Sequence, residues 1–151
     1  MPTTTIDIAD LASLEGRDLG FTDYLEITQE RINTFADATN DHQWIHVDPE
    51  RAKDGPFGTA IAHGFLTLSL GIALWSDLLE VNGATTKVNY GLNKVRFVSP
   101  VPVGSKIRMS AVVASVTEVG GGWQIGVDQV IEVEGAPKPA VVTHSLYRFY
   151  A

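Results

Sequence analysis

The stretch HGFLTLSLGIALWSDLL, residues 63–79, decides the fold of this 151-residue chain. From Phe65 to Trp75 it carries apolar or small residues on every side of the expected helix, and Ser76 and Asp77 are its first clearly polar pair. A helix that is apolar all round has to be surrounded by protein. The stretch therefore predicts a central helix around which the rest of the chain packs.

Most of the chain after this helix has the pattern of long β-strands. Within residues 105–119, Ile107 and Met109 alternate with Arg108 and Ser110, which is typical of a half-buried strand. Four such segments are expected, at residues 87–97, 105–119, 123–135 and 140–150. The glycine- and proline-rich joins at 120–122 and 135–139 are too short for a crossover helix, so they predict antiparallel hairpins.

A central helix followed by antiparallel strands predicts an α+β fold in which a curved sheet covers the helix with its concave face. Such a sheet has an edge strand with unpaired backbone groups, and pairing two copies edge to edge would hide it. We expect one domain over residues 1–151 that forms a homodimer. Residues 1–20 are expected to be an N-terminal extension or a short helix.

The composition narrows the choice of partners and compartment. A net charge of −7 and a pI near 4.9 give a surface that repels polyanions, so nucleic acid is not an expected partner. The chain has no cysteine, which excludes a thiol nucleophile and thiolate metal sites. Its start has neither a basic region nor a long apolar run, and no segment reaches the length of a membrane span. We therefore expect a cytoplasmic protein without membrane contact.

The segment ATNDHQWIHVDPERA, residues 38–52, holds an acid and an imidazole between two expected helices. Thr28 is a plausible N-cap for a helix over 29–39, and Asp48 followed by Pro49 marks the start of a second, short helix. Residues five apart diverge by about 140° on a helix and lie on opposite faces of a strand. Only a bend in the connector over 41–47 would therefore bring Asp41 and His46 together. The alternative is that Asp41 caps a turn and His46 is an ordinary surface residue.

His63 and Gly64 open the central helix. A helix start offers unpaired N–H groups and the positive end of the helix dipole, and both suit a developing negative charge. The alternative is that Gly64 only permits close packing. An oxyanion donor and a proton-transferring pair are together the parts that addition of water to an α,β-unsaturated thioester requires.

The run D-H-Q-W-I-H followed by V-D-P, then A-H-G-F-L-T, resembles the R-specific enoyl-CoA hydratases of the MaoC-like dehydratase family. The downstream stretch NYGLNKVRFVSPVPVGSKI is also similar to that family, and the resemblance covers roughly residues 20–150. It implies a hot-dog fold, a homodimer, and syn hydration of trans-2-enoyl-CoA to R-3-hydroxyacyl-CoA without a metal or organic cofactor.

The resemblance also implies roles for individual residues. Asp41 and His46 match the catalytic pair that activates water, and Gly64 matches the backbone donor to the thioester oxygen, with His63 beside it at the substrate. The family usually has Asn-Pro where this chain has Gln43-Trp44, so the turn that positions His46 differs here.

Other candidates carry weaker signals. Lys94 and Arg96, with the neighbouring strand's Lys106 and Arg108, are candidates for binding the phosphates of CoA, or they form a solvated strand face. His42 and His46 lack the HExxH pattern and a third clustered ligand, so no metal site is expected. Because one fold hosts many activities, an acyl-CoA thioesterase and a non-catalytic acyl-CoA-binding module remain the alternatives to a hydratase.

Overall fold

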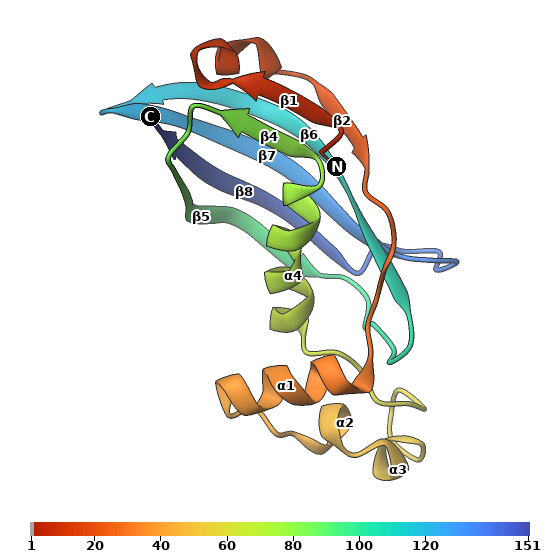
Figure 1. Ribbon diagram of the computed structural model, residues 1–151. Coiled ribbons are helices and arrows are strands. Elements are labelled where there is room, and N and C mark those ends of the chain that lie inside the picture. The colour runs from red at the N-terminus through yellow and green to blue at the C-terminus, as the bar shows by residue number, and fades with distance from the viewer. Residues whose placement is uncertain (1) are drawn as a thin grey trace.

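The computed structural model describes residues 2–151 and contains a strongly curved antiparallel sheet (Figure 1). Its four long strands confirm the four predicted segments: β5 (Thr86–Phe97), β6 (Lys106–Val119), β7 (Gly122–Val133) and β8 (Val141–Tyr150). Hairpins join β6 to β7 and β7 to β8, while β5 pairs with β8. The order β6-β7-β8-β5 therefore places β5 at one edge of the sheet.

The N-terminal residues form one short helix, within the residues 1–20 for which an extension or a short helix was expected, and three strands. They form β1 (Thr4–Asp7), a 3₁₀ helix η1 (Ile8–Leu14), β2 (Asp18–Phe21) and β3 (Leu25–Glu26). Strands β2 and β3 both pair with β6, and β1 runs parallel to β4 (Leu79–Asn82) in a separate two-stranded sheet. The segment expected as an extension or short helix is thus part of the fold, because η1 supplies Leu11 and Leu14 to the core with no exposed surface.

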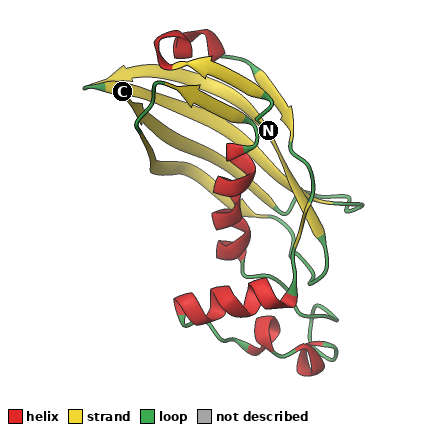
Figure 2. Ribbon diagram, in the orientation of Figure 1, coloured by secondary structure: helices red, strands yellow, loops and turns green. Residues whose placement is uncertain are grey.

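The central helix α4 (Gly64–Ser76) lies across the concave side of the sheet, as predicted (Figure 2). Leu66, Leu70 and Leu74 are buried and belong to one core cluster with apolar residues of β6, β7 and β8. The prediction that protein surrounds this helix is wrong for a single chain, because Phe65 is 67% exposed and Ile72 is 41% exposed. Within residues 2–151, no helix is both long and apolar enough to cross a membrane.

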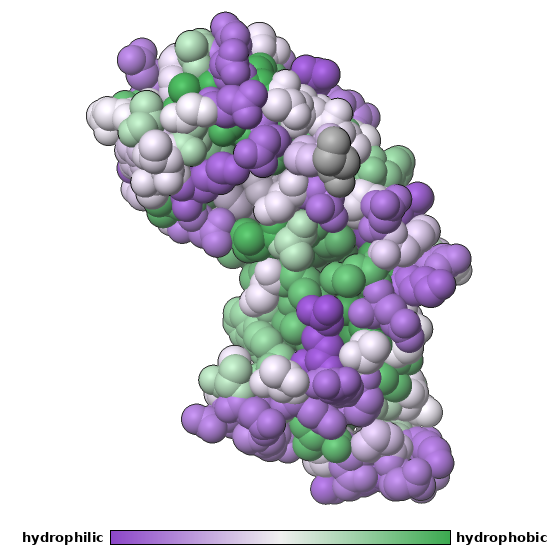
Figure 3. Space-filling view, in the orientation of Figure 1, coloured by the Kyte–Doolittle hydropathy of each residue, from purple (hydrophilic) through white to green (hydrophobic). Residues whose placement is uncertain are grey.

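Apolar surface gathers over this uncovered side. The space-filling view shows hydrophobic residues concentrated in the narrow middle of the molecule, over α4 (Figure 3). The edge strand β5 is exposed along almost its whole length, and Val88, Tyr90, Leu92 and Phe97 are among its exposed side chains. A contiguous apolar surface of this kind marks an interaction site in a stable protein.

Three helices form a layer at the N-terminal end of α4, away from the sheet (Figure 1). They are α1 (Gln29–Thr39), α2 (Trp44–Val47) and α3 (Pro49–Ala52). The predicted caps are confirmed, since Thr28 accepts a hydrogen bond from the Arg31 N–H and Asp48 accepts one from the Arg51 N–H. The connector over 41–47 is not a plain loop, because its second half makes the single helical turn α2.

Candidate active site

A sharp bend after α1 brings Asp41 and His46 together. Asn40 ends α1 in the left-handed conformation with φ of 59°, a region that asparagine tolerates better than most residues. One carboxylate oxygen of Asp41 and one ring nitrogen from each of His46 and His63 lie within 4.8 Å of one another. Both histidines are buried and Asp41 is exposed. The side chains of the predicted pair thus converge, and His63 joins them.

The ring of His46 is held in one tautomer. Its Nδ1 lies 2.7 Å from the carbonyl oxygen of Ile61, and because a carbonyl can only accept, Nδ1 carries the proton. Burial lowers the pKa of His46, an effect that this hydrogen bond and the charge of Asp41 partly oppose and the charge of His63 reinforces. His46 is therefore neutral at neutral pH, with Nε2 free to accept a proton.

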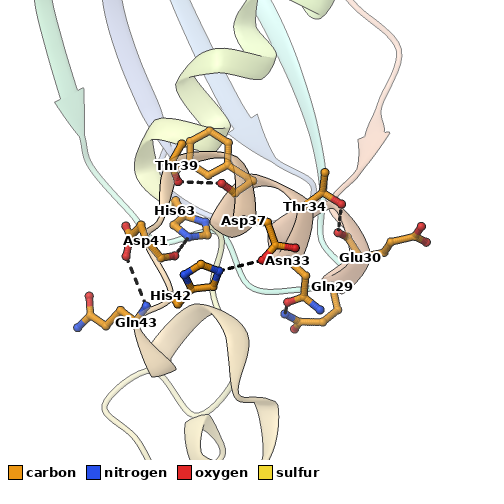
Figure 4. Close-up of polar contacts among 11 residues, drawn as sticks. Gln29, Glu30, Asn33, Thr34, Asp37, Thr39, Asp41, His42, Gln43 and His63 are labelled. Carbon is orange, nitrogen blue, oxygen red and sulfur yellow. Dashed lines mark hydrogen bonds and ion pairs between the residues drawn. The ribbon is translucent and has the colours of Figure 1, made fainter.

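His63 lies behind this pair and touches both of its members. Its Nε2 donates to the backbone carbonyl of Asp41 at 3.0 Å, as Figure 4 shows. Its ring stacks on that of His46 with centroids 4.0 Å apart and packs against Phe35 on the other side at 4.9 Å. With only 2% of its surface exposed, His63 fixes the backbone of Asp41 and the plane of His46 at once.

Packing of Trp44 and a hydrogen bond from Gln29 hold the segment that carries His46, where this chain has Gln43-Trp44. The ring of Trp44 packs so tightly on Gly55 that a Cβ there would lie 2.8 Å from it, and Arg51 covers its face at 4.3 Å. Gln29 from α1 donates to the backbone carbonyl of His46 at 2.8 Å. Packing of Trp44 therefore anchors the segment that carries His46.

His42 does not belong to the cluster. Its Nε2 lies 2.8 Å from a carboxylate oxygen of Asp37 on α1, on the exposed side of the bend (Figure 4). The side chain of Asp41 accepts from the Gln43 N–H at 3.4 Å. Although His42 lies four residues before His46, it thus adds no imidazole to the cluster of Asp41, His46 and His63.

Among residues 2–151, Asp41, His46 and His63 form a cluster whose side chains could hold a metal ion. A ring nitrogen directs its lone pair in the plane of the ring. The rings of His46 and His63 are stacked with only 23° between their planes, so one ion cannot lie in both planes. This arrangement suits a hydrogen-bonded pair better than a metal centre.

A cavity of about 260 Å³ opens beside His46 and the start of α4. Gly64 lines it, and among residues 2–151 no group accepts a hydrogen bond from the Gly64 N–H. A Cβ on Gly64 would lie 3.0 Å from the ring of Phe97, so close packing also favours glycine here. Thr67, one turn further on, lines the same cavity, is 1% exposed, and has no hydrogen-bond partner for its hydroxyl in the described part of the chain.

Thr67 was missed by the sequence analysis. A threonine in an apolar helix usually returns its hydroxyl to the preceding turn, so its presence alone is a weak signal. The signal that the sequence does contain is its place one turn after His63-Gly64, on the same side of the helix.

None of the four predicted cations lines this cavity, and they differ in their surroundings. Arg108 forms an ion pair with Glu132 and covers the rings of Phe21 and Tyr24, so it is already engaged. Lys94 and Arg96 lie on the edge strand β5, and neither forms an ion pair with an acidic side chain of residues 2–151.

The lowered pKa of His46 predicts a dependence of stability on pH. The unfolded chain binds a proton at His46 more readily than the folded protein does, so protonation of His46 favours unfolding. Above about pH 6.5 His46 is neutral in both states and does not destabilise the fold. As the pH drops from there through the lower pKa of the folded protein, the free energy of unfolding falls. Urea unfolding at pH 5 and pH 7.5 should show a larger loss for the wild type than for His46→Gln. Equal losses in the two proteins would contradict this assignment.

A family described as MaoC like domain matches residues 10–134. The chain belongs to the MaoC-like dehydratase family. This makes it an enzyme of the hydro-lyase class.

One MaoC-like relative shares much of the sequence. The chain is 53% identical over 145 residues to the 3-hydroxyacyl-thioester dehydratase Z of Mycobacterium tuberculosis, covering 95% of this chain and 96% of the relative. Among solved structures, the R-hydratase PhaJ1 from Pseudomonas aeruginosa has a TM-score of 0.72 at 21% identity, covering 90% of this chain and 81% of that one. An (R)-hydratase from A. caviae gives 0.73 at 22% identity, covering 88% and 94%. These structures confirm the hot-dog fold.

Proposed function

We propose that this MaoC-like enzyme is an R-specific enoyl-CoA hydratase that adds water syn across trans-2-enoyl-CoA and catalyses the reverse dehydration. The observation that carries the proposal is that a carboxylate and a neutral imidazole converge beside a cavity lined by Gly64, whose N–H has no acceptor among residues 2–151. The similarity to the 3-hydroxyacyl-thioester dehydratase supports the same substrate class.

In the proposed reaction, His46 is the base and Asp41 orients the attacking water. Nε2 of His46 takes a proton as the water oxygen bonds to C3 of the enoyl group, and negative charge moves to the thioester oxygen. The Gly64 N–H, at the positive end of the α4 dipole, stabilises that charge. His46 then gives the proton to C2. Because oxygen and proton come from the same loop, both reach one face of the double bond.

His63 acts in this scheme as a positioning residue. Its contacts include the backbone of Asp41 and the ring of His46, while His46 and Thr67, but not His63, are among the residues that line the cavity with Gly64. The buried hydroxyl of Thr67 then contacts the substrate near its thioester. Lys94 and Arg96 offer unpaired positive charge for the phosphates of CoA in a protein whose net charge is −7.

A homodimer completes this proposal. The uncovered side of α4 and the exposed edge of β5 form apolar surface that a second copy would bury by continuing the sheet. Placing a charge in that surface with Ile72→Glu should convert the dimer to monomers in sedimentation velocity. An Ile72→Glu protein that sediments like a dimeric wild type, or a wild type that is itself monomeric, would contradict the proposed interface.

Hydration and its alternatives are separated by two measurements on one sample. With crotonyl-CoA, a hydratase removes the conjugated enoyl absorbance without releasing thiol. With a saturated acyl-CoA, a thioesterase releases free CoA thiol, and a binding module binds the ligand without turnover. We expect loss of the enoyl absorbance and no thiol. Thiol release, or tight binding with the absorbance unchanged, would overturn the hydratase proposal.

A further inference from the structure

A second cavity, of about 410 Å³, lies between α4, the concave face of the sheet and the edge strand β5. Ile72 and Leu92, which belong to the surface that the proposed homodimer buries, also line it, so a second copy of the chain would cover that side of the cavity. Leu68, Met109 and Ile131 give it an apolar wall suited to methylene groups. The same wall also contains four polar side chains in a row along β7 and β8: Gln129, Thr143, Ser145 and Tyr147. All four are buried, on a face where the neighbouring inward positions of these strands are apolar.

The four polar side chains form a hydrogen-bonded group. The amide oxygen of Gln129 accepts from the hydroxyls of Thr143 at 3.1 Å and Ser145 at 2.7 Å. The amide nitrogen of Gln129 donates to the hydroxyl oxygen of Tyr147 at 2.8 Å. An amide nitrogen carries two protons. The second N–H of Gln129 has no acceptor among residues 2–151, so this cavity wall carries a spare hydrogen-bond donor.

This cavity lies next to the one at the active site. Along β8, Val141 lines the first cavity and Thr143 lines the second, two residues apart on the same face, which is a spacing of about 7 Å. Along α4, Thr67 lines the first cavity and Leu68 the second. A chain whose thioester oxygen meets the Gly64 N–H would therefore run along α4 into the space beside Gln129.

We infer that this enzyme selects enoyl thioesters whose acyl chain carries an oxygen, as a keto or hydroxyl group, several carbons beyond the double bond. The inference rests on the proposed hydratase activity and deepens it by naming the substrate class. A plain alkyl chain leaves the buried donor of Gln129 without a partner, and a polar group left unpaired away from water is costly. A keto or hydroxyl oxygen in the chain accepts from it. The competing explanation is that the four residues only fix the pairing of β7 with β8.

A matched pair of substrates tests this inference on the wild-type protein. One is trans-2-decenoyl-CoA, and the other is the same thioester with a keto group next to its terminal methyl group. Gain of one buried hydrogen bond predicts a kcat/KM about tenfold higher for the keto substrate. Crotonyl-CoA, which is too short to reach Gln129, serves as the reference substrate.

A variant of the cavity wall tests whether the preference for the keto substrate arises in this cavity. Combining Gln129→Leu, Thr143→Val, Ser145→Ala and Tyr147→Phe removes the whole polar group, so no partner is left unpaired. The preference for the keto substrate should fall to about one or reverse. If this protein does not fold, Gln129→Met serves as the second variant and should lose the same preference.

The outcomes separate this inference from the proposed function. A wild type that does not hydrate crotonyl-CoA overturns the hydratase proposal and the inference with it. A wild type that hydrates crotonyl-CoA but prefers the plain chain, or shows no preference, overturns only the inference. A keto preference that survives in the fourfold variant, or in Gln129→Met where that variant takes its place, also overturns it, because the recognising group then lies elsewhere.

Discussion

His46→Gln and Asp41→Asn should each lower the kcat for hydration of crotonyl-CoA by about 10²- to 10⁴-fold, the usual contribution of a positioned acid–base group. His46→Gln removes the Nε2 that the Ile61 hydrogen bond leaves free, and Asp41→Asn removes the charge that orients water. Both changes keep side-chain size nearly constant. Initial rates of loss of the enoyl absorbance give the measurement.

The chain offers a matched control for these variants in His42→Gln. His42 lies four residues before His46 and forms an exposed contact with Asp37, outside the cluster. The His42→Gln variant should hydrate crotonyl-CoA at close to the wild-type rate. Circular dichroism and urea unfolding at pH 7.5 establish that all three proteins are folded. Wild-type rates in both His46→Gln and Asp41→Asn would reject the assignment of the pair.

Gly64→Pro should lower kcat by about 10²- to 10³-fold, because it removes the one N–H that we assign to the thioester oxygen. Proline is tolerated at the first position of a helix, where Gly64 lies, and His63 before it already has an extended conformation that proline accepts. The substitution therefore removes a donor with little demand on the backbone.

Gly64→Ala is the matched control for this experiment. Its Cβ meets the ring of Phe97 as that of proline does, but the N–H remains. A shift of the Phe97 ring by a few tenths of an ångström would relieve this contact. We expect Gly64→Ala to lose much less activity than Gly64→Pro. Equal losses in kcat would show that contact with Phe97, and not the N–H, explains the glycine.

Much of the fold could be predicted because local patterns and long-range packing agree. Thr28 and the Asp48-Pro49 pair mark helix starts by capping chemistry, and alternation in residues 105–119 marks a strand with one buried face. The strands that were missed, such as Thr4–Asp7 and Leu79–Asn82, are only four residues long. They depend on pairing with each other across the chain, which no local pattern records.

The candidate site, like the fold, could be predicted from the sequence only in part. Spacing and helix-breaking residues indicated that a bend would join Asp41 to His46, and the bend at Asn40 does so. The sequence could not reveal that His63 holds the backbone of Asp41, that the Thr67 hydroxyl has no partner among residues 2–151, or that one side of α4 is uncovered. Each of these depends on which atoms meet and which stay unpaired or exposed after folding, and that is a property of the tertiary structure.

The most direct test of the central claim is the stereochemistry of hydration in D₂O. The account places the base, the water and the returning proton on one face of the enoyl group, with the thioester oxygen at Gly64. NMR of the product from crotonyl-CoA should therefore show R-3-hydroxybutyryl-CoA with deuterium at C2 on the same face as the new hydroxyl. An S product, or deuterium on the opposite face, would contradict the account.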